Sequence, residues 1–169
     1  KTGKIGVATL NRPEALNALN FDMIMALSDK YQAWAKDSNI QAVIIQSSSP
    51  RAFSAGGDLK QLYTMGRSDI ELDVMFFKHE YLLSQSIHEY PKPYIALLDG
   101  IAMGGGLGVS VNGSHIVAGT NLIMAMPETR IGLYPDTGAS YFLSHAPNYL
   151  GMYMGLTGNH LNIADALLT

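Results

Sequence analysis

The sequence has 169 residues, of which 47% are hydrophobic and 15% are charged, with a net charge of −3 and no cysteine. This length and composition suit a single domain with a sizeable core. The weak negative charge, without a basic cluster, argues against nucleic acid as the main partner, and the lack of cysteine excludes disulfides and thiolate zinc sites. No apolar run is long enough to cross a membrane and no signal-peptide pattern opens the chain, so we expect a soluble intracellular protein without membrane contact.

Strand and helix patterns alternate along the first half of the chain. Residues 4–10 form a strand pattern, and a helix is predicted to begin near Asn20 or Asp22, with apolar residues recurring every three or four positions. Residues 42–47 are a continuous apolar run, which is typical of a strand covered on both faces. The loop SSSPRAFSAGGDLKQL then leads into a helix near Asp58, because an acid suits a helix N-terminus.

The second half continues this alternation. We expect a helix over roughly residues 69–88, a buried strand at 94–98, a short helix after the run IAMGGGLG, and strand-like runs HIVAG and LIMAM. Strands that lead into glycine-rich loops at one edge indicate an α/β architecture. A helix start at Asn162, so close to the end, leads us to expect that residues 1–169 are one core domain of a longer chain.

Two glycine-rich loops are candidates for binding an anion. Residues 55–58 (AGGD) and 103–108 (MGGGLG) each lie between a predicted strand and a predicted helix, where backbone N–H groups are free to hold an oxyanion. The alternative is that the glycines only allow tight turns and close packing. Neither loop matches a nucleotide-binding fingerprint, since the G-x-G-x-x-G pattern fails at Val109. Ser110 does not fit the G-x-S-x-G nucleophile elbow, because Asn112 stands where the last glycine is needed.

Two acids, Glu128 and Asp136, punctuate the apolar run MPETRIGLYPDTG. Each follows a proline, and PDTG is a turn signature, so the intervening chain must bend and can bring both carboxylates into one pocket. Paired acids in apolar surroundings have their pKa values pushed apart, which suits one as a base and the other as an orienting group. The alternative is that Glu128 caps the backbone and Asp136 makes only an Asx turn.

A third acid, Glu80, falls on the apolar face of the helix predicted over 69–88. From periodicity alone, a salt bridge at the edge of the core is the alternative to a functional role. The five histidines show no spacing typical of metal ligands, so we expect no metal site.

Four motifs in order, NRPEALNAL, RAFSAGGDL, KPYIALLDGIAMGGGLG and MPETRIGLYPDTG, resemble the crotonase (enoyl-CoA hydratase/isomerase) superfamily, and the last resembles its 3-hydroxyisobutyryl-CoA hydrolases. The resemblance covers essentially the whole chain. It implies the ClpP/crotonase fold, a spiral of strand-strand-helix turns, with a C-terminal helical part beyond this chain. It also implies a homo-oligomer, trimer or hexamer, and an acyl-CoA substrate without a separate cofactor.

The resemblance assigns roles to the glycine loops. The backbone N–H groups of Gly57 and Gly105 would hold the thioester carbonyl. Ala55 would lie beside the adenine, and Asp58 and Lys60 would belong to the substrate-binding loop, with Lys60 near a CoA phosphate.

The resemblance also separates hydration from hydrolysis. Gly108 stands where hydratases carry their first catalytic glutamate, which disfavours simple hydration. Glu128 matches the second catalytic glutamate, Asp136 the acid that marks the hydrolases, and Glu80 a further acid of their substrate site. The expected reaction is hydrolysis of 3-hydroxyisobutyryl-CoA to 3-hydroxyisobutyrate and CoA, a step of valine catabolism. The alternatives are an enoyl-CoA hydratase or isomerase, and a non-catalytic acyl-CoA-binding or assembly subunit.

Overall fold

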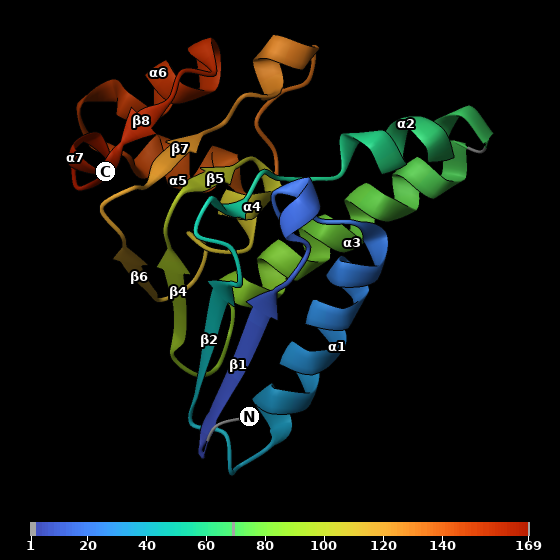
Figure 1. The fold of residues 1–169 in the computed structure, drawn as a ribbon, viewed down its shortest axis with the longest axis vertical. Helices are drawn as coiled ribbons and strands as arrows, with labels where there is room; N and C mark the ends of the chain where they lie inside the picture. Colours follow the sequence, from blue (N-terminus) through green and yellow to red (C-terminus); the bar gives the residue numbers. More distant parts are fainter. Residues whose placement is uncertain (1–2, 69, 169) are drawn as a thin grey trace.

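The computed structural model describes residues 3–68 and 70–168. Their strands form two four-stranded sheets (Figure 1). The first sheet is entirely parallel and consists, in spatial order, of β1 (Ile5–Leu10), β2 (Ala42–Ser47), β4 (Tyr94–Leu98) and β6 (His115–Ala118). The second consists of β3 (Ala52–Ser54), β5 (Ile101–Met103) and β7 (Ile123–Ala125), which are parallel, and β8 (Leu161–Asn162), which is antiparallel to β7.

The two sheets arise from one repeating connection. The pairs β2–β3, β4–β5 and β6–β7 each send their first strand to the first sheet and their second strand to the second sheet. Helices follow the first two pairs, so the chain winds as strand-strand-helix turns. At the bend between β4 and β5, Gly100 has φ +66°, and a β-carbon there would lie 2.5 Å from the Arg51 carbonyl oxygen, so only glycine fits without strain. The expected α/β spiral is confirmed.

The helices begin and end at recognisable signals. The Asn20 side chain accepts a hydrogen bond of 2.9 Å from the Met23 N–H, which caps the first long helix. The α-helices are α1 (Phe21–Lys36), α2 (Leu59–Ser68), α3 (Ile70–His88), α4 (Gly105–Gly108), α5 (Ala139–His145), α6 (Leu150–Thr157) and α7 (Ile163–Ala166), and the 3-10 helices are η1 (Pro13–Ala15), η2 (Glu128–Ile131) and η3 (Pro147–Tyr149). No helix in the described ranges has both the length and the apolar character needed to span a bilayer.

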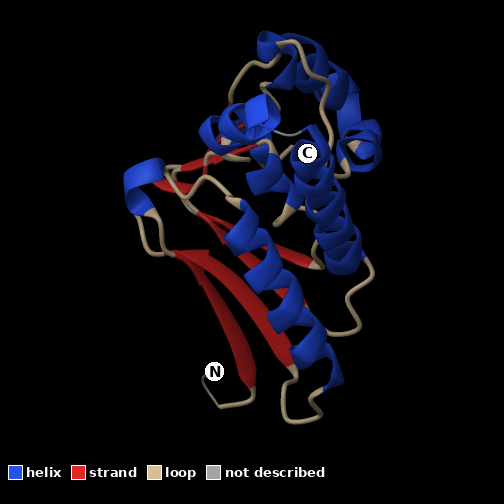
Figure 2. Ribbon diagram, turned by 90° about the vertical axis from the view of Figure 1, so that its right-hand side faces the viewer, coloured by secondary structure: helices blue, strands red, loops and turns tan. Residues whose placement is uncertain are grey.

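The main core lies between the first sheet and the helices α1 and α3, which cover the same side of it (Figures 1 and 2). The Tyr31 and Tyr94 rings meet edge to face at 5.3 Å, joining α1 to β4. The expectation that residues 42–47 are covered on both faces is wrong. Ile44 is only half-buried, and on the outer face the Gln46 amide donates to the Thr9 hydroxyl at 3.2 Å, so this side carries polar groups as well.

Most predicted elements are confirmed, including the helix over 69–88, which is α3, although residue 69 lies outside the described residues. The sequence pattern did not predict β3 and β5, which are three residues long and lead directly into the glycine loops. Strands this short have no alternation of their own, and they exist because each pairs with a neighbour in the second sheet.

Replacing Tyr94 with phenylalanine should destabilise the protein by about 1–3 kcal/mol, because the buried Tyr94 hydroxyl donates to the Val109 carbonyl at 2.8 Å and pairs with the Tyr31 hydroxyl at 3.0 Å. Urea unfolding measures the loss. Tyr149→Phe is the matched control, since this side chain is 81% exposed. Equal losses in the two variants would contradict the importance of the buried bonds.

Candidate active site

The first glycine loop is clamped by the segment after η1. The Leu19 N–H donates to the Gly56 carbonyl at 2.7 Å, and the Asp58 N–H donates to the Leu19 carbonyl at 2.9 Å. The Gly56 carbonyl and the Gly57 N–H belong to one trans peptide group and point in opposite directions, so the Gly57 N–H is directed away from Leu19. Gly56 has φ +97°, which explains why a glycine stands there.

The second glycine loop packs directly on the first. Gly105 opens α4, so its N–H has no partner within that helix. A β-carbon built on Gly56 would lie 3.4 Å from the Gly105 nitrogen, and one built on Gly105 would lie 3.4 Å from the Gly57 nitrogen. The two nitrogens expected to hold an oxyanion therefore belong to backbone segments in contact. A β-carbon on Gly106 would lie 2.6 Å from the Ser54 carbonyl oxygen, so this approach requires glycine.

Two of the predicted acids, one on α3 and one on η2, lie against glycines of the second loop. Glu80 projects from α3 and is 3% exposed, and its Oε1 occupies the place where a β-carbon of Gly105 would be. Glu128 opens η2, is 8% exposed, and its Oε1 lies 2.7 Å from the place of a β-carbon on Gly104. Glycine at both positions is therefore what gives the carboxylates room.

Asp136 completes the group from the loop before α5. Its Oδ2 accepts a hydrogen bond of 2.7 Å from the Tyr81 hydroxyl. Tyr81 directly follows Glu80 on α3. The next residue, Thr137, is buried with φ +48°, and its carbonyl accepts from the Asn112 side-chain amide at 3.1 Å. The same amide donates to the Gly108 carbonyl at 2.8 Å, so Asn112 links the acid loop to α4.

The three acids and both glycine loops surround one cavity of about 80 Å³. Its remaining walls are mainly apolar. The lining residues are Ala55, Gly56, Gly57, Leu59, Leu62, Phe76, Phe77, Glu80, Gly104, Gly105, Pro127, Glu128, Ile131, Leu133 and Asp136. The proximity predicted for Glu128 and Asp136 from the bend between their prolines is thus observed.

Burial of three carboxyl groups around one space shifts their titration. Burial, with the nearby charges of Asp136 and Glu128, raises the pKa of Glu80 to about 8. Burial raises the pKa of Glu128 to about 7, against a backbone hydrogen bond that lowers it and with a further rise from the Asp136 charge. Burial also raises the pKa of Asp136, although hydrogen bonds from Tyr81 and its own backbone oppose the rise. At neutral pH the site can hold both a protonated acid and an ionised one.

Two carboxylate oxygens in this group, Glu80 Oε1 and Glu128 Oε2, are buried without a hydrogen-bond donor among the described residues. Buried polar atoms without partners are costly, and they point to a ligand or water with polar groups of its own. The salt bridge considered for Glu80 is not formed at Oε1. Within the described ranges, no three His, Asp or Glu side chains are grouped to hold a metal ion.

The other residues assigned to substrate binding lie differently. Ala55 lines the cavity, whereas Asp58 and Lys60 do not. Asp58 Oδ2 accepts from Arg12 Nη1 at 2.6 Å and its Oδ1 accepts from the Gln61 N–H at 3.0 Å, so this carboxylate caps α2 and holds the loop. Lys60 is exposed on α2. Sequence reasoning missed Arg12, because its partner is 46 residues away.

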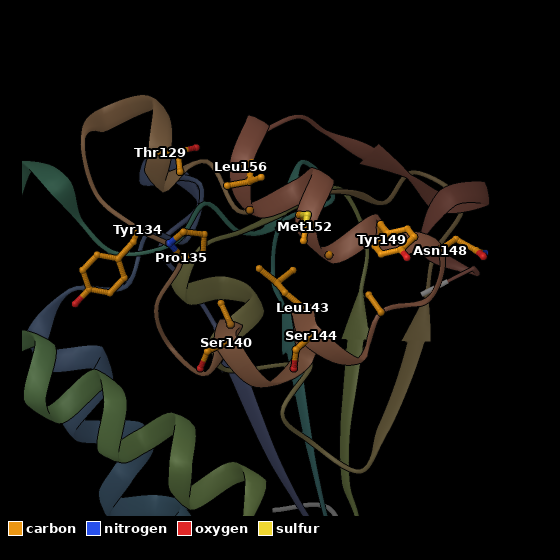
Figure 3. A pocket seen from close by; sticks show the side chains of 14 residues that line it. Thr129, Tyr134, Pro135, Ser140, Leu143, Ser144, Asn148, Tyr149, Met152 and Leu156 are labelled. Carbon is orange, nitrogen blue, oxygen red and sulfur yellow. The ribbon is translucent and has the colours of Figure 1, made fainter.

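A larger hollow of about 920 Å³ lies between α5 and α6 (Figure 3). Its wall is mostly apolar and includes Leu143, Tyr149, Met152 and Leu156. No carboxylate of the described residues lines it, whereas three carboxyl groups line the smaller cavity.

The family model described as Enoyl-CoA hydratase/isomerase matches residues 5–169. The chain belongs to the enoyl-CoA hydratase/isomerase family. Among its curated relatives, 3-hydroxyisobutyryl-CoA hydrolase, mitochondrial, of Xenopus tropicalis is 48% identical over 165 residues, which are 98% of this chain and 43% of that protein. The human protein of the same name is 41% identical over 165 residues, which are again 98% of this chain and 43% of that protein. The chain thus spans less than half the length of these relatives.

Solved structures of the family have the same fold. A carnitinyl-CoA dehydratase from Mycobacterium thermoresistibile matches with TM-score 0.95 at 40% identity, over 98% of this chain and 49% of the other. An enoyl-CoA hydratase from Rhodobacter sphaeroides 2.4.1 matches with TM-score 0.96 at 37% identity, over 99% of this chain and 50% of the other. The enoyl-CoA hydratase/isomerase fold predicted from the motifs is therefore confirmed.

The raised pKa of Glu80 makes the stability of this family member depend on pH. Between the ordinary value of 4.5 and about 8, the folded protein keeps a proton on Glu80 that the unfolded chain releases. The free energy of unfolding should therefore fall as pH rises through this window, by at most about 5 kcal/mol from this group. Glu80→Gln should flatten the decline, measured by urea unfolding from pH 4.5 to 8.

Glu89→Gln is the matched control for this prediction, because Glu89 is exposed just after the same helix. It should follow the wild-type pH dependence. A Glu80→Gln variant that loses stability with pH as steeply as the wild type would show that Glu80 titrates normally.

Proposed function

We propose that this chain is the core of an acyl-CoA thioester hydrolase that converts 3-hydroxyisobutyryl-CoA to 3-hydroxyisobutyrate and CoA. The observation that carries the proposal is one cavity bordered by the Gly57 and Gly105 backbone and by three acids, Glu80, Glu128 and Asp136. Relatives named 3-hydroxyisobutyryl-CoA hydrolase at 41–48% identity support the choice of substrate.

The two backbone N–H groups would hold the thioester oxygen. As the carbonyl carbon becomes tetrahedral, negative charge builds on this oxygen, and donors that are fixed in advance stabilise it without reorganisation. One such donor contributes about 3 kcal/mol in comparable acyl-transfer sites. The clamp of the Gly57 loop on Leu19 keeps its donor in place before substrate arrives.

Glu128 would drive the attack by one of two routes. As a general base it takes a proton from water while the water oxygen bonds to the carbonyl carbon. The C–S bond then breaks, and the proton passes to the departing CoA sulfur. As a nucleophile, its carboxylate attacks the carbonyl carbon and expels CoA thiolate, and water hydrolyses the resulting anhydride. With a pKa of about 7, Glu128 is available in its ionised form near neutral pH.

The other two acids suit the polar end of the substrate. Asp136 would accept a hydrogen bond from the 3-hydroxyl group or position the attacking water. Glu80, with a pKa of about 8, keeps its proton at neutral pH and can donate a hydrogen bond to the same region. Ala55 would lie toward the CoA nucleotide, with Asp58 holding this loop in place through Arg12, and Lys60 would approach a phosphate from solvent.

Packing at Gly108 supports hydrolysis over hydration. A β-carbon on Gly108 would lie 2.5 Å from the β-carbon of Thr137 and 3.1 Å from the Ser84 hydroxyl oxygen. A glutamate at this position, the one expected to serve hydration, would not fit without moving Thr137. The full-length protein would act as a homo-oligomer on acyl-CoA substrates.

Enoyl-CoA hydration or isomerisation is the second candidate, because the solved relatives carry hydratase and dehydratase names and Glu128 alone can move a proton next to a thioester carbonyl. A thiol-release assay on the full-length protein with 3-hydroxyisobutyryl-CoA, beside a product assay with an enoyl-CoA, decides between them. We expect free CoA from the first and no change in the second. Conversion of only the enoyl-CoA, or binding of both esters without turnover, would overturn the proposal.

Glu128→Ala should lower thioester hydrolysis about 10³-fold or more, since it removes the attacking group or base. The dissociation constant for a CoA ester, measured by calorimetry, should change little because the two N–H donors remain. Glu14→Ala, an exposed acid in η1, is the control and should keep full activity. Wild-type turnover in Glu128→Ala would remove Glu128 from the mechanism.

A further inference from the structure

We propose that Tyr81 is a positioning residue that fixes the carboxylate of Asp136 on the inner wall of the catalytic cavity. The inference rests on the proposed function, since it assigns Tyr81 to the same thioesterase site. It starts from a single contact, the 2.7 Å hydrogen bond from the Tyr81 hydroxyl to Asp136 Oδ2.

Two adjacent residues of α3, Glu80 and Tyr81, lie differently relative to the cavity. Glu80 is buried and lines the cavity, whereas Tyr81 is 38% exposed and does not line it. The Tyr81 ring rests against Phe77, one turn earlier, with ring centroids 6.0 Å apart, and this contact settles where its hydroxyl lies. The Tyr81 hydroxyl therefore reaches the cavity through Asp136.

Asp136 forms part of a wall between two spaces. It lines the 80 Å³ catalytic cavity on one side and a more open hollow of about 260 Å³, shared with Tyr81, on the other. Its backbone is fixed, because its carbonyl accepts from the Ala139 N–H at 2.7 Å and Asn112 holds Thr137. The last torsion of an aspartate is nevertheless broad, so a fixed backbone does not by itself orient the carboxylate. The Tyr81 bond supplies that restraint.

The same bond favours the charged form of Asp136. The titratable groups around this bond are Glu80 on α3 and Glu128 on η2, which interact with Asp136, and Tyr134 on the Asp136 loop, which interacts with Tyr81. The glycines of α4 add no charge. The Tyr81 hydroxyl lowers the pKa of Asp136 against burial, which raises it. Burial and the Asp136 bond raise the pKa of Tyr81, so Tyr81 remains a donor. The Tyr81 bond therefore favours the ionised form of Asp136 beside Glu80, whose pKa is about 8.

Tyr81→Phe tests the proposal, because it keeps the ring and removes only the donor. A bond to a charged group is strong enough that we expect about a tenfold or greater loss of kcat/KM for 3-hydroxyisobutyryl-CoA below neutral pH. The loss should deepen as the pH falls, since Asp136 takes up a proton more readily without the Tyr81 donor. Tyr149→Phe, on an exposed tyrosine far along the chain, should leave the profile unchanged.

A double-mutant cycle shows whether Tyr81 works through Asp136. Tyr81→Phe combined with Asp136→Asn should lose no more activity than Asp136→Asn alone. Losses that multiply would overturn the proposal, because Tyr81 would then act elsewhere. A loss in Tyr81→Phe that is the same at every pH would overturn it as well.

Two titrations need no turnover and stand even if the proposed reaction is wrong. Carboxyl ¹³C NMR should report a higher Asp136 pKa in Tyr81→Phe than in the wild type. The reciprocal measurement, ring ¹³C NMR of Tyr81, should report a lower phenol pKa in Asp136→Asn, and it keeps the proposal testable if Tyr81→Phe does not fold. No change in either titration would contradict the inference, whereas absence of hydrolysis by the wild type would contradict only the proposed function.

Discussion

The site depends on what glycine omits. Gly104 and Gly105 leave empty the places where side chains would collide with Glu128 and Glu80, and Gly56 lets the two loops touch. Because these positions lack β-carbons, two backbone nitrogens and two buried carboxylates can share a space of about 80 Å³. Any larger residue would force apart either the loops or the acids, and the N–H donors and the acids would no longer border one cavity.

This crowding has an electrostatic consequence. Three carboxyl groups so close in apolar surroundings cannot all be ionised cheaply, so Glu80 and Glu128 titrate near neutrality. Desolvation and mutual repulsion thus oppose folding at higher pH while they create the acid and base forms that the proposed hydrolysis requires. Burial raises the pKa of Asp136 too, but the Tyr81 hydroxyl stabilises its charge and opposes the rise. Stability and chemistry are coupled through the same three side chains.

Rigid elements support this arrangement from outside. Tyr94 ties the first sheet to the residue after α4 through the Val109 carbonyl, and Asn112 ties α4 to the loop that carries Asp136. Arg12 holds the first glycine loop through Asp58. Hydrogen bonds between distant segments are short-ranged and directional, so each fixes one part of the site relative to its neighbours. The cavity is therefore set by the packed frame before any ligand binds.

Local pattern and composition determined much of this protein in advance. The helices α1 and α3, the strands β1, β2 and β4, the two glycine loops and the acids at 80, 128 and 136 follow from periodicity, turn residues and motif resemblance, because these signals lie within a few neighbouring residues. Only the tertiary structure decided that β3 and β5 are strands, that residues 42–47 are covered on one face, and that Asp58 forms an ion pair with Arg12. It also decided that Tyr81 meets Asp136, 55 residues away. Such contacts depend on how the spiral brings separate turns of chain together, and no local pattern in the sequence encodes that distance.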